Sequence, residues 1–200
     1  MKKIISLFQR NYETDRLVRD EVVPGAEWAL RGEGIPTRKI DGTSCLYQNG
    51  TLYKRYDARA GKTPPPGFIA AQAPDPVTGH WPGWLAIGDG PEDRWHREAL
   101  ALLKSEHADI PEGTYELIGP KVQGNAEHAE THRLIRHGSE ILEDLLPLQR
   151  AGRLSFETIK AYLAAHPIEG IVWWKDINDQ DCEKVKIKRR DFKLPWPVKE

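Results

Sequence analysis

The sequence predicts an α+β fold built around antiparallel sheets. Short runs typical of β-strands outnumber helical runs along the chain. Asn49-Gly50 lies between two of these runs and is a strong signal for a two-residue β-hairpin. The run at 171–174 is apolar enough to be buried on both faces of a sheet.

Six strands are expected. The hairpin at Asn49-Gly50 would return the chain so that Lys54 and Arg55 come back beside Lys39. The expected strands are 37–41, 44–48, 51–56, 113–117, 170–175 and 183–187.

Three helices are expected, at 92–104, 139–149 and 155–166. The last opens with Ser155 as an N-cap and Thr158 three residues later. A proline- and glycine-rich stretch from Thr63 to Gly83 is expected to form a long surface loop.

Composition suits one globular domain spanning residues 1–200, because 39% of the residues are hydrophobic and 30% are charged. The apolar stretch at the N-terminus is too short for a signal-peptide core, and no apolar run approaches the length of a membrane span. Cys45 and Cys182 form neither a metal-binding pattern nor a disulfide framework. We therefore expect a cytoplasmic protein with reduced thiols.

The charge pattern is local rather than global. A net charge of −1 and a pI of about 6.7 argue against a protein that coats nucleic acid through charge alone. In the run 184–188, however, lysines alternate with Val185 and Ile187, so the lysines share one face of a strand. Their ammonium groups suit a triphosphate, and a solvated basic face is the alternative.

Four segments carry candidate chemistry in a fixed order: 37–43 around Lys39, 114–119 around Glu116, 168–173 around Glu169, and 183–188. They resemble the nucleotidyl motifs of the covalent nucleotidyltransferase superfamily, which includes polynucleotide ligases and messenger RNA capping enzymes. The resemblance is strongest to ATP-dependent RNA ligases. It runs from about Gly32 to Lys188, although 60–111 contains no recognisable motif.

The resemblance implies a nucleotidyltransferase domain, an ATP-grasp-like adenylation fold of antiparallel sheets with flanking helices. We expect no C-terminal OB barrel, since only Arg189–Glu200 follow the last motif. DNA ligases and capping enzymes of this superfamily usually carry that barrel. A minimal DNA ligase or capping guanylyltransferase is therefore the second hypothesis, and a non-catalytic nucleotide- or RNA-binding module is the third.

The resemblance also assigns the catalytic residues. Lys39 is the nucleophile, which must lose its proton before it attacks phosphorus. Lys186 and Lys188 contact the α-phosphate and the departing pyrophosphate and stabilise the charge that develops there. We expect these two lysines, rather than Arg38, to favour deprotonation of Lys39, because Arg38 points to the opposite face of its strand.

The remaining assignments concern the nucleotide and a divalent cation. Glu169 is expected to hold Mg²⁺ or Mn²⁺, with Asp41 contributing. Arg55 binds the nucleotide or an incoming 5′-phosphate, with Lys54 as the competing candidate. Nucleotide-binding residues are expected to be Thr37, Asp41, Gly42, Arg55, Glu116, Glu169, Lys186 and Lys188, with Gly42 allowing a tight backbone turn and Glu116 contacting the ribose hydroxyls.

The expected activity is RNA ligation in three steps. Lys39 takes AMP from ATP, the AMP moves to an RNA 5′-phosphate to form an RNA-adenylate, and a 3′-hydroxyl displaces it. We expect a monomer without membrane contact and a role in RNA repair.

Several side chains have no single assignment. Adenine could stack on Phe156 or Tyr162. The histidines at 128, 132 and 137 do not form a metal pattern, and that segment is expected to be solvated or to contact phosphates through Lys121, Arg133 or Arg136. The tryptophans at 81, 84 and 95 suit either base stacking or core packing.

Overall fold

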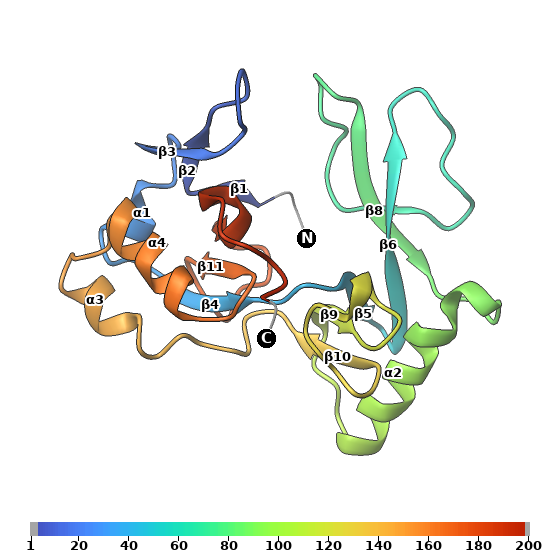
Figure 1. Cartoon of the computed structure of the whole chain (residues 1–200). Coiled ribbons are helices and arrows are strands. Elements are labelled where there is room, and N and C mark those ends of the chain that lie inside the picture. Colours follow the sequence, from blue (N-terminus) through green and yellow to red (C-terminus); the bar gives the residue numbers. More distant parts are fainter. Residues whose placement is uncertain (1–3, 199–200) are drawn as a thin grey trace. The chain divides into compact units, whose positions relative to one another are not determined.

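The structure is a computed structural model that describes residues 4–198. The chain forms two compact units (Figure 1). The outer unit comprises residues 4–40 and 138–198, and the inserted unit is Asp41–His137, which interrupts it. Whether these two units together make up the single domain expected over residues 1–200 stays a prediction.

The outer unit contains a four-stranded sheet in the order β1-β12-β11-β4. β11 pairs antiparallel with both β12 and β4, whereas β1 runs parallel to β12. All five residues of β11 are buried, which confirms the prediction of a strand covered on both faces. The strands are β1 (Ile5–Ser6), β4 (Ile35–Lys39), β11 (Gly170–Trp174) and β12 (Lys184–Lys188).

One face of this sheet forms the core of the outer unit. Ile171 and Trp173 of β11 and Val185 and Ile187 of β12 alternate onto it, each at most 1% exposed. Helix α4 contributes Ile159 and Leu163 to the same cluster. The remaining elements are β2 (Phe8–Arg10), β3 (Val18–Val22), α1 (Glu27–Leu30), α3 (Leu146–Arg150), α4 (Phe156–Ala165) and the 3₁₀ helix η3 (Arg189–Phe192).

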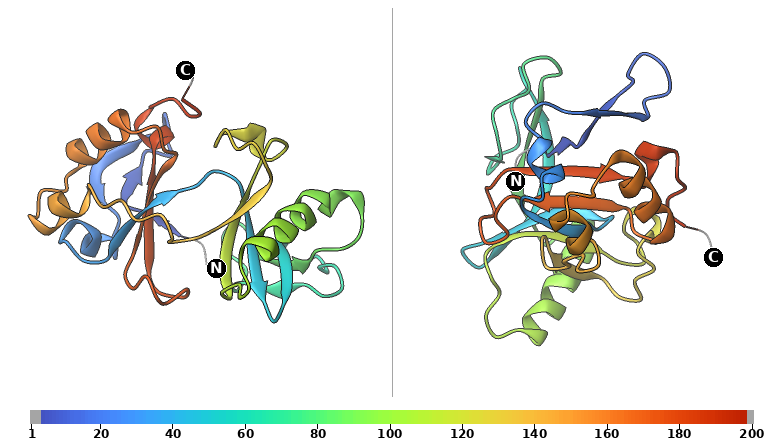
Figure 2. Two further views of the ribbon diagram at one scale, coloured as in Figure 1. Left: turned by 90° about the horizontal axis from the view of Figure 1, so that it is seen from below. Right: turned by 90° about the vertical axis from the view of Figure 1, so that its left-hand side faces the viewer.

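The inserted unit is built on a six-stranded antiparallel sheet in the order β10-β9-β5-β6-β8-β7. Helix α2 (Arg94–Glu106) packs against this sheet (Figure 2), with Ala99 and Leu103 in a cluster that includes Cys45 and Tyr115. The strands are β5 (Thr43–Gln48), β6 (Thr51–Arg59), β7 (Ile69–Ala70), β8 (His80–Ala86), β9 (Gly113–Ile118) and β10 (Arg133–Arg136), and the 3₁₀ helices are η1 (Pro91–Asp93) and η2 (Gln123–Asn125).

Local signals predicted several boundaries correctly. Asn49 and Gly50 have φ values of 49° and 74° and join β5 to β6 as the expected hairpin. Ser155 caps α4, accepting from the Thr158 backbone N–H, and Thr158 reciprocates in a capping box. All six expected strands are present, and their ends shift by no more than three residues.

The helix predicted at 139–149 is largely wrong, because only Leu146–Arg150 is helical. The preceding residues instead bond to the edge of β4. Arg38 N–H donates to the Glu140 carbonyl at 2.8 Å, and Leu142 N–H donates to the Pro36 carbonyl at 2.9 Å. The backbone therefore satisfies its hydrogen bonds by sheet pairing rather than within a helix.

The long surface loop predicted between Thr63 and Gly83 is also partly wrong. Its end belongs to β8, where Pro82 pairs with Asp57 of β6. Gly83 suits this strand because the Phe68 ring lies over it, 2.3 Å from where a Cβ would be. Strands β1, β2, β3, β7, β8 and β10 were not predicted.

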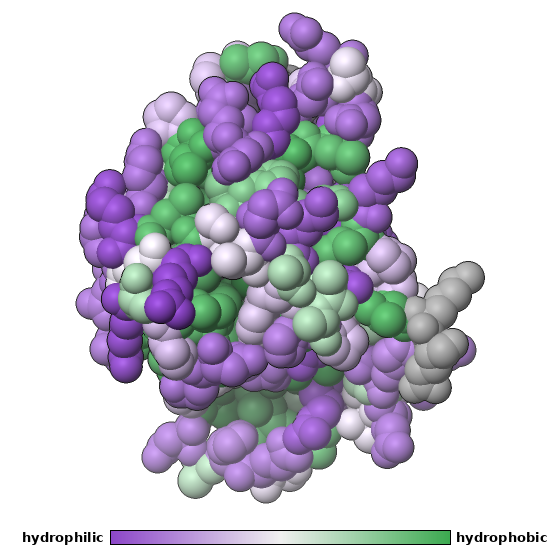
Figure 3. Space-filling model, turned by 60° about the vertical axis from the view of Figure 1, so that its left-hand side comes forward, coloured by the Kyte–Doolittle hydropathy of each residue, from purple (hydrophilic) through white to green (hydrophobic). Residues whose placement is uncertain are grey.

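Hydrophilic and hydrophobic residues are interspersed on the surface that Figure 3 presents. Some hydrophobic side chains packed against the outer-unit core, including Leu148 and Phe156, are only partly buried. Within residues 4–198, no helix combines the length and the apolar character required to span a bilayer.

Candidate active site

Three strands of the outer unit bring motif residues into register. Gly170 at the start of β11 is paired with Lys39 at the end of β4 and with Lys188 at the end of β12. Two pairs further along, Val172 lies between Thr37 and Lys186. Residues two apart on a strand share a face, so Lys39, Lys186 and Lys188 lie on one face of this sheet, opposite the hydrophobic core.

Lys39 and Glu169 form an ion pair in which the Lys39 ammonium contacts Glu169 Oε2. Lys39 Nζ also lies 3.5 Å from the Ile40 carbonyl. Glu169 lies in the bend before β11 and is only 7% exposed. The predicted nucleophile and the predicted cation ligand are therefore direct neighbours.

Gly170 has a structural reason to follow Glu169. A Cβ at Gly170 would lie 2.2 Å from the carbonyl oxygen of Ile187, so only glycine allows β11 and β12 to approach this closely. The Glu169 carbonyl accepts from Arg189 N–H at 2.8 Å, immediately after β12. This Glu-Gly pair is thus fixed against the strand that carries the lysines.

Lys186 lies in a buried and positively charged environment. Burial, together with the positive charges of Lys39 and Lys188, lowers its pKa to about 8. Lys184, by contrast, donates to the Gln180 carbonyl at 2.6 Å and lies 4.1 Å from the centroid of the Trp174 ring. Lys184 therefore contacts its own loop and the Trp174 ring. The structure confirms that the three lysines share one face of β12, but the ammonium group of Lys184 is bonded elsewhere.

A buried carboxylate orders the end of β12. Asp191, 2% exposed, accepts from Lys188 N–H at 2.9 Å and from Arg10 Nη2 at 2.6 Å. The β2–β3 hairpin, which carries Arg10, thereby supports the backbone of a predicted phosphate ligand. Arg38 pairs with Glu140 at 3.0 Å, separately from Lys39, as the alternation of β4 predicts.

Thr37 lies deep within the sheet. It is 1% exposed, and its hydroxyl donates to the Val172 carbonyl at 3.0 Å and accepts from Trp174 Nε1 at 3.1 Å. These contacts give Thr37 a structural function in the outer unit. Its predicted contact with a nucleotide stays a prediction.

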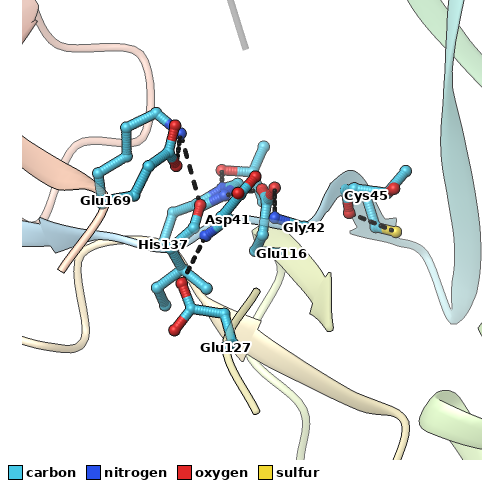
Figure 4. Close-up of polar contacts among 11 residues, drawn as sticks. Asp41, Gly42, Cys45, Glu116, Glu127, His137 and Glu169 are labelled. Atoms are coloured by element: carbon cyan, nitrogen blue, oxygen red, sulfur yellow. Dashed lines mark hydrogen bonds and ion pairs between the residues drawn. The ribbon is translucent and has the colours of Figure 1, made fainter. Parts of the chain in front are cut away.

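In the inserted unit, the Glu116 carboxylate orders the backbone at Gly42, which belongs to the motif segment 37–43 (Figure 4). Its Oε1 accepts from Gly42 N–H at 3.0 Å, and its Oε2 lies 2.7 Å from His137 Nε2. Glu116 is 8% exposed, so it does not face solvent as an ordinary polar residue on the outer face of a strand would. A Cβ at Gly42 would lie 2.2 Å from the Leu117 carbonyl oxygen, which explains glycine by the close approach of β9.

Asp41 is held through its backbone by a residue that was not predicted. Its N–H donates to Glu127 Oε1 at 2.7 Å. Glu127 and His137 both come from the histidine-rich segment 119–137, which follows β9 and includes β10. The sequence shows only that polar residues are dense in this segment. It does not indicate that Glu127 contacts Asp41 or that His137 contacts Glu116.

Arg55 and Lys54 lie on opposite faces of β6. Lys54 pairs with Asp93 at 2.6 Å, and Asp93 is 2% exposed. Arg55 pairs with the half-exposed Asp57 at 3.0 Å, and its guanidinium lies 5.5 Å from the Trp84 ring centroid. Breaking a buried ion pair is more costly than breaking an exposed one, so Arg55 is the better candidate for a phosphate.

The other flagged side chains are mostly engaged in packing. His132 stacks on Trp95 with ring centroids 4.4 Å apart and is 5% exposed, so the expectation of a solvated segment is wrong for His132. Trp84 is 2% exposed. Phe156 packs edge-on against Phe8 and Phe192 in the outer-unit core.

Further contacts complete this survey. Tyr162 stacks on His166 and donates to Asp144 at 2.8 Å. Arg133 pairs with Glu106, whereas Lys121 is exposed. Across residues 4–198, no group of three or more His, Cys, Asp and Glu is arranged to hold a metal ion.

These features define a class of site. A lysine paired with a buried carboxylate, next to two further lysines on one sheet face, is suited to bind a polyphosphate and to form a bond to phosphorus. Within the inserted unit, taken by itself, Glu116 is an oriented carboxylate that is suited to hydroxyl groups.

Two curated proteins are similar to this chain in sequence. RNA ligase 1 of Pongo abelii is 25% identical over 231 aligned residues, which cover 82% of this chain and 69% of that protein. RNA ligase 1 of Danio rerio is 28% identical over 149 aligned residues, which cover 60% of this chain and 43% of that protein. No protein-family model matches the chain. These similarities support a relationship to RNA ligases in general.

Proposed function

We propose that this chain is an ATP-dependent RNA ligase that acts through a covalent Lys39–AMP intermediate. The observation that carries the proposal is the Lys39–Glu169 ion pair beside Lys186 and Lys188 on one face of the outer-unit sheet. The similarity to two RNA ligases supports the same activity. The ligated ends are an RNA 5′-phosphate and an RNA 3′-hydroxyl, and the proposed role is RNA repair.

In the first step, the deprotonated nitrogen of Lys39 attacks the α-phosphorus of ATP. A P–N bond forms, the P–O bond to pyrophosphate breaks, and pyrophosphate leaves. Lys186 and Lys188 stabilise the negative charge on the α-phosphate and on the leaving group. Val185 and Ile187 anchor β12 in the core, which places both lysines on the opposite face of the strand.

In the second step, an oxygen of the RNA 5′-phosphate attacks the phosphorus of Lys39–AMP, and the P–N bond breaks. In the third, the 3′-hydroxyl attacks the activated phosphate, a phosphodiester forms and AMP leaves. We assign Arg55 to the incoming phosphate because its partner Asp57 is half exposed. In this proposal Thr37, Asp41 and Gly42 also contribute to nucleotide binding.

The donor chemistry of Glu169 fits a hard divalent cation. Mg²⁺ retains several waters and needs only one or two carboxylates, so a site with few acidic side chains is sufficient. We propose that Glu169 holds Mg²⁺ or Mn²⁺, with Asp41 as a further ligand. When bound, the cation would neutralise charge on the phosphates and favour attack at phosphorus.

Intact-mass measurement after incubation with ATP and MgCl₂ tests the first step. We expect the wild type to gain the mass of one AMP group and Lys39→Ala to gain nothing. Lys104→Ala, an exposed change on α2, is the control and should be labelled like the wild type. Adenylation of the Lys39→Ala variant would contradict the assignment of the nucleophile.

The choice of nucleotide separates this proposal from its rivals. Labelling by GTP alone would favour a capping guanylyltransferase. RNA or nucleotide binding without any covalent label would favour a binding module.

The acceptor requires a second experiment. Wild-type protein should join 5′-phosphorylated RNA to RNA with a 3′-hydroxyl, and it should fail when the 3′ end carries a phosphate. Matched DNA strands are the comparison. Equal or faster sealing of DNA would replace the RNA ligase with a minimal DNA ligase while leaving the covalent step intact.

A further inference from the structure

The contacts of Glu116 point to a residue that none of the four motifs includes. Both oxygens of its carboxylate are already oriented within the inserted unit, one by Gly42 N–H at 3.0 Å and one by His137 Nε2 at 2.7 Å (Figure 4). The side chains of Glu116 and His137 are 11% and 16% exposed. A carboxylate in this environment is held in one orientation rather than turning freely.

The direction of the hydrogen bond follows from the chemistry of the two groups. An ionised carboxylate only accepts, so His137 Nε2 must carry the proton. His137 Nδ1 lies 2.9 Å from Thr114 Oγ1, and a hydroxyl either donates or accepts by rotating. His137 N–H also donates to the Thr114 carbonyl at 3.0 Å. Thr114 therefore fixes both the backbone and the ring of His137.

The oriented carboxylate retains acceptor capacity. Each carboxylate oxygen has two lone-pair sites, and the contacts with Gly42 and His137 occupy one on each oxygen. Two sites on neighbouring oxygens suit two hydroxyl groups on adjacent carbons, as on a ribose. A 2′-deoxyribose would satisfy only one of them.

We infer that His137 is a positioning residue that orients Glu116 to accept both ribose hydroxyls of the nucleotide and so selects ribonucleotides over 2′-deoxyribonucleotides. This inference rests on the proposed function, because it takes the ligand of Glu116 to be the ribose of ATP. His137 acts through Glu116 and does not itself contact the nucleotide.

Two variants of His137 separate positioning from general structural support. His137→Asn places its amide near the Nδ1 position, which faces Thr114, and removes the donor to Glu116. His137→Gln is longer, and its amide nitrogen can take the place of Nε2. We expect Asn to lose the positioning and Gln to restore it. His107→Asn, an exposed histidine after α2, is the control.

The first readout is equilibrium binding of ATP and 2′-deoxy-ATP by calorimetry. We expect the wild type to bind ATP about tenfold more tightly, the change that one lost hydrogen bond to a charged group can produce. His137→Asn should lose most of this preference, whereas His137→Gln should keep it within about threefold of the wild type.

The second readout is the rate of Lys39 adenylation as a function of ATP concentration. His137→Asn should raise the ATP concentration for half-maximal rate about tenfold, with a much smaller change in the maximal rate. Urea midpoints of all variants show whether the fold is retained.

The outcomes are distinguishable. If folded His137→Asn and His137→Gln both keep the wild-type preference for ATP, or if the wild type shows no preference, the inference is overturned. It is also overturned if His137→Gln loses the preference as fully as His137→Asn. If the wild type prefers ATP in binding but never labels Lys39, the proposed ligase function fails while the role of His137 stands.

Discussion

Replacing Lys186 by methionine tests whether a predicted phosphate ligand destabilises the fold that carries it. Burial and the neighbouring charges of Lys39 and Lys188 lower the pKa of Lys186 from 10.5 to about 8. Each pKa unit corresponds to about 1.4 kcal/mol, so a charged Lys186 lowers the free energy of unfolding by about 3 kcal/mol at most. Methionine retains a long apolar side chain without the charge.

The pH dependence has a defined sign. Because the pKa of Lys186 is lower in the folded than in the unfolded state, the unfolded chain binds more protons between about pH 8 and pH 10.5. The destabilisation is complete below about pH 8 and is relieved as the pH rises towards 10.5. The Lys186→Met variant should therefore exceed the wild type by about 3 kcal/mol at pH 7 and by less than about 1 kcal/mol near pH 10.

Urea denaturation of both proteins at several pH values measures this difference. Lys104→Met, at an exposed position of α2, is the control and should change stability by less than about 0.5 kcal/mol. The same Lys186→Met protein should lose Lys39 adenylation, since the proposed phosphate contact of Lys186 requires its charge. If Lys186→Met is no more stable than the wild type at pH 7, or if its advantage does not shrink with rising pH, the reasoning is refuted.

Three further experiments test other parts of the structure. In urea denaturation, Gly170→Ala should lower the free energy of unfolding by about 1–3 kcal/mol, because its Cβ would lie 2.2 Å from a carbonyl oxygen of β12. The control is Gly88→Ala, whose Cβ would have its nearest contact at 3.8 Å and which should change the free energy of unfolding by less than about 1 kcal/mol. Equal losses in the two variants would contradict this. Gln149→Leu should lower it by about 3 kcal/mol in urea denaturation, since the buried amide bonds to two carbonyls and one indole; a loss below about 1 kcal/mol would contradict this. In the native protein, iodoacetamide should modify Cys182 alone, because burial raises the pKa of the Cys45 thiol; mass spectrometry showing equal modification of both would disprove its protection.

Strands whose side chains divide between core and surface were predictable from sequence. In β12 the alternation of lysines with Val185 and Ile187 reflects two different environments, and the structure places both apolar residues in the core. Strand β3, Val18–Val22, has three exposed central residues and too little apolar alternation to reveal it. The segment 139–142 was misassigned because its pairing with β4 depends on residues a hundred positions away.

The residues of the candidate site were predictable where they belong to recognisable strands. Lys39, Glu169, Lys186 and Lys188 lie in or beside strands with clear periodicity, and the structure brings them together in the outer unit. His137 carries no such signal. Its contact with Glu116 depends on β10 pairing with β9, and residue spacing does not encode that pairing.

The contacts of Glu116 also have a consequence for folding. Gly42 and His137 lie at the two ends of the inserted unit, and both bond to this one carboxylate. Once Asp41–His137 has folded, its ends are tied together, so it behaves towards the outer unit as a short connection rather than a long flexible loop. The entropy required to close a loop grows with its length, so folding of the inserted segment should speed the joining of residues 4–40 with residues 138–198.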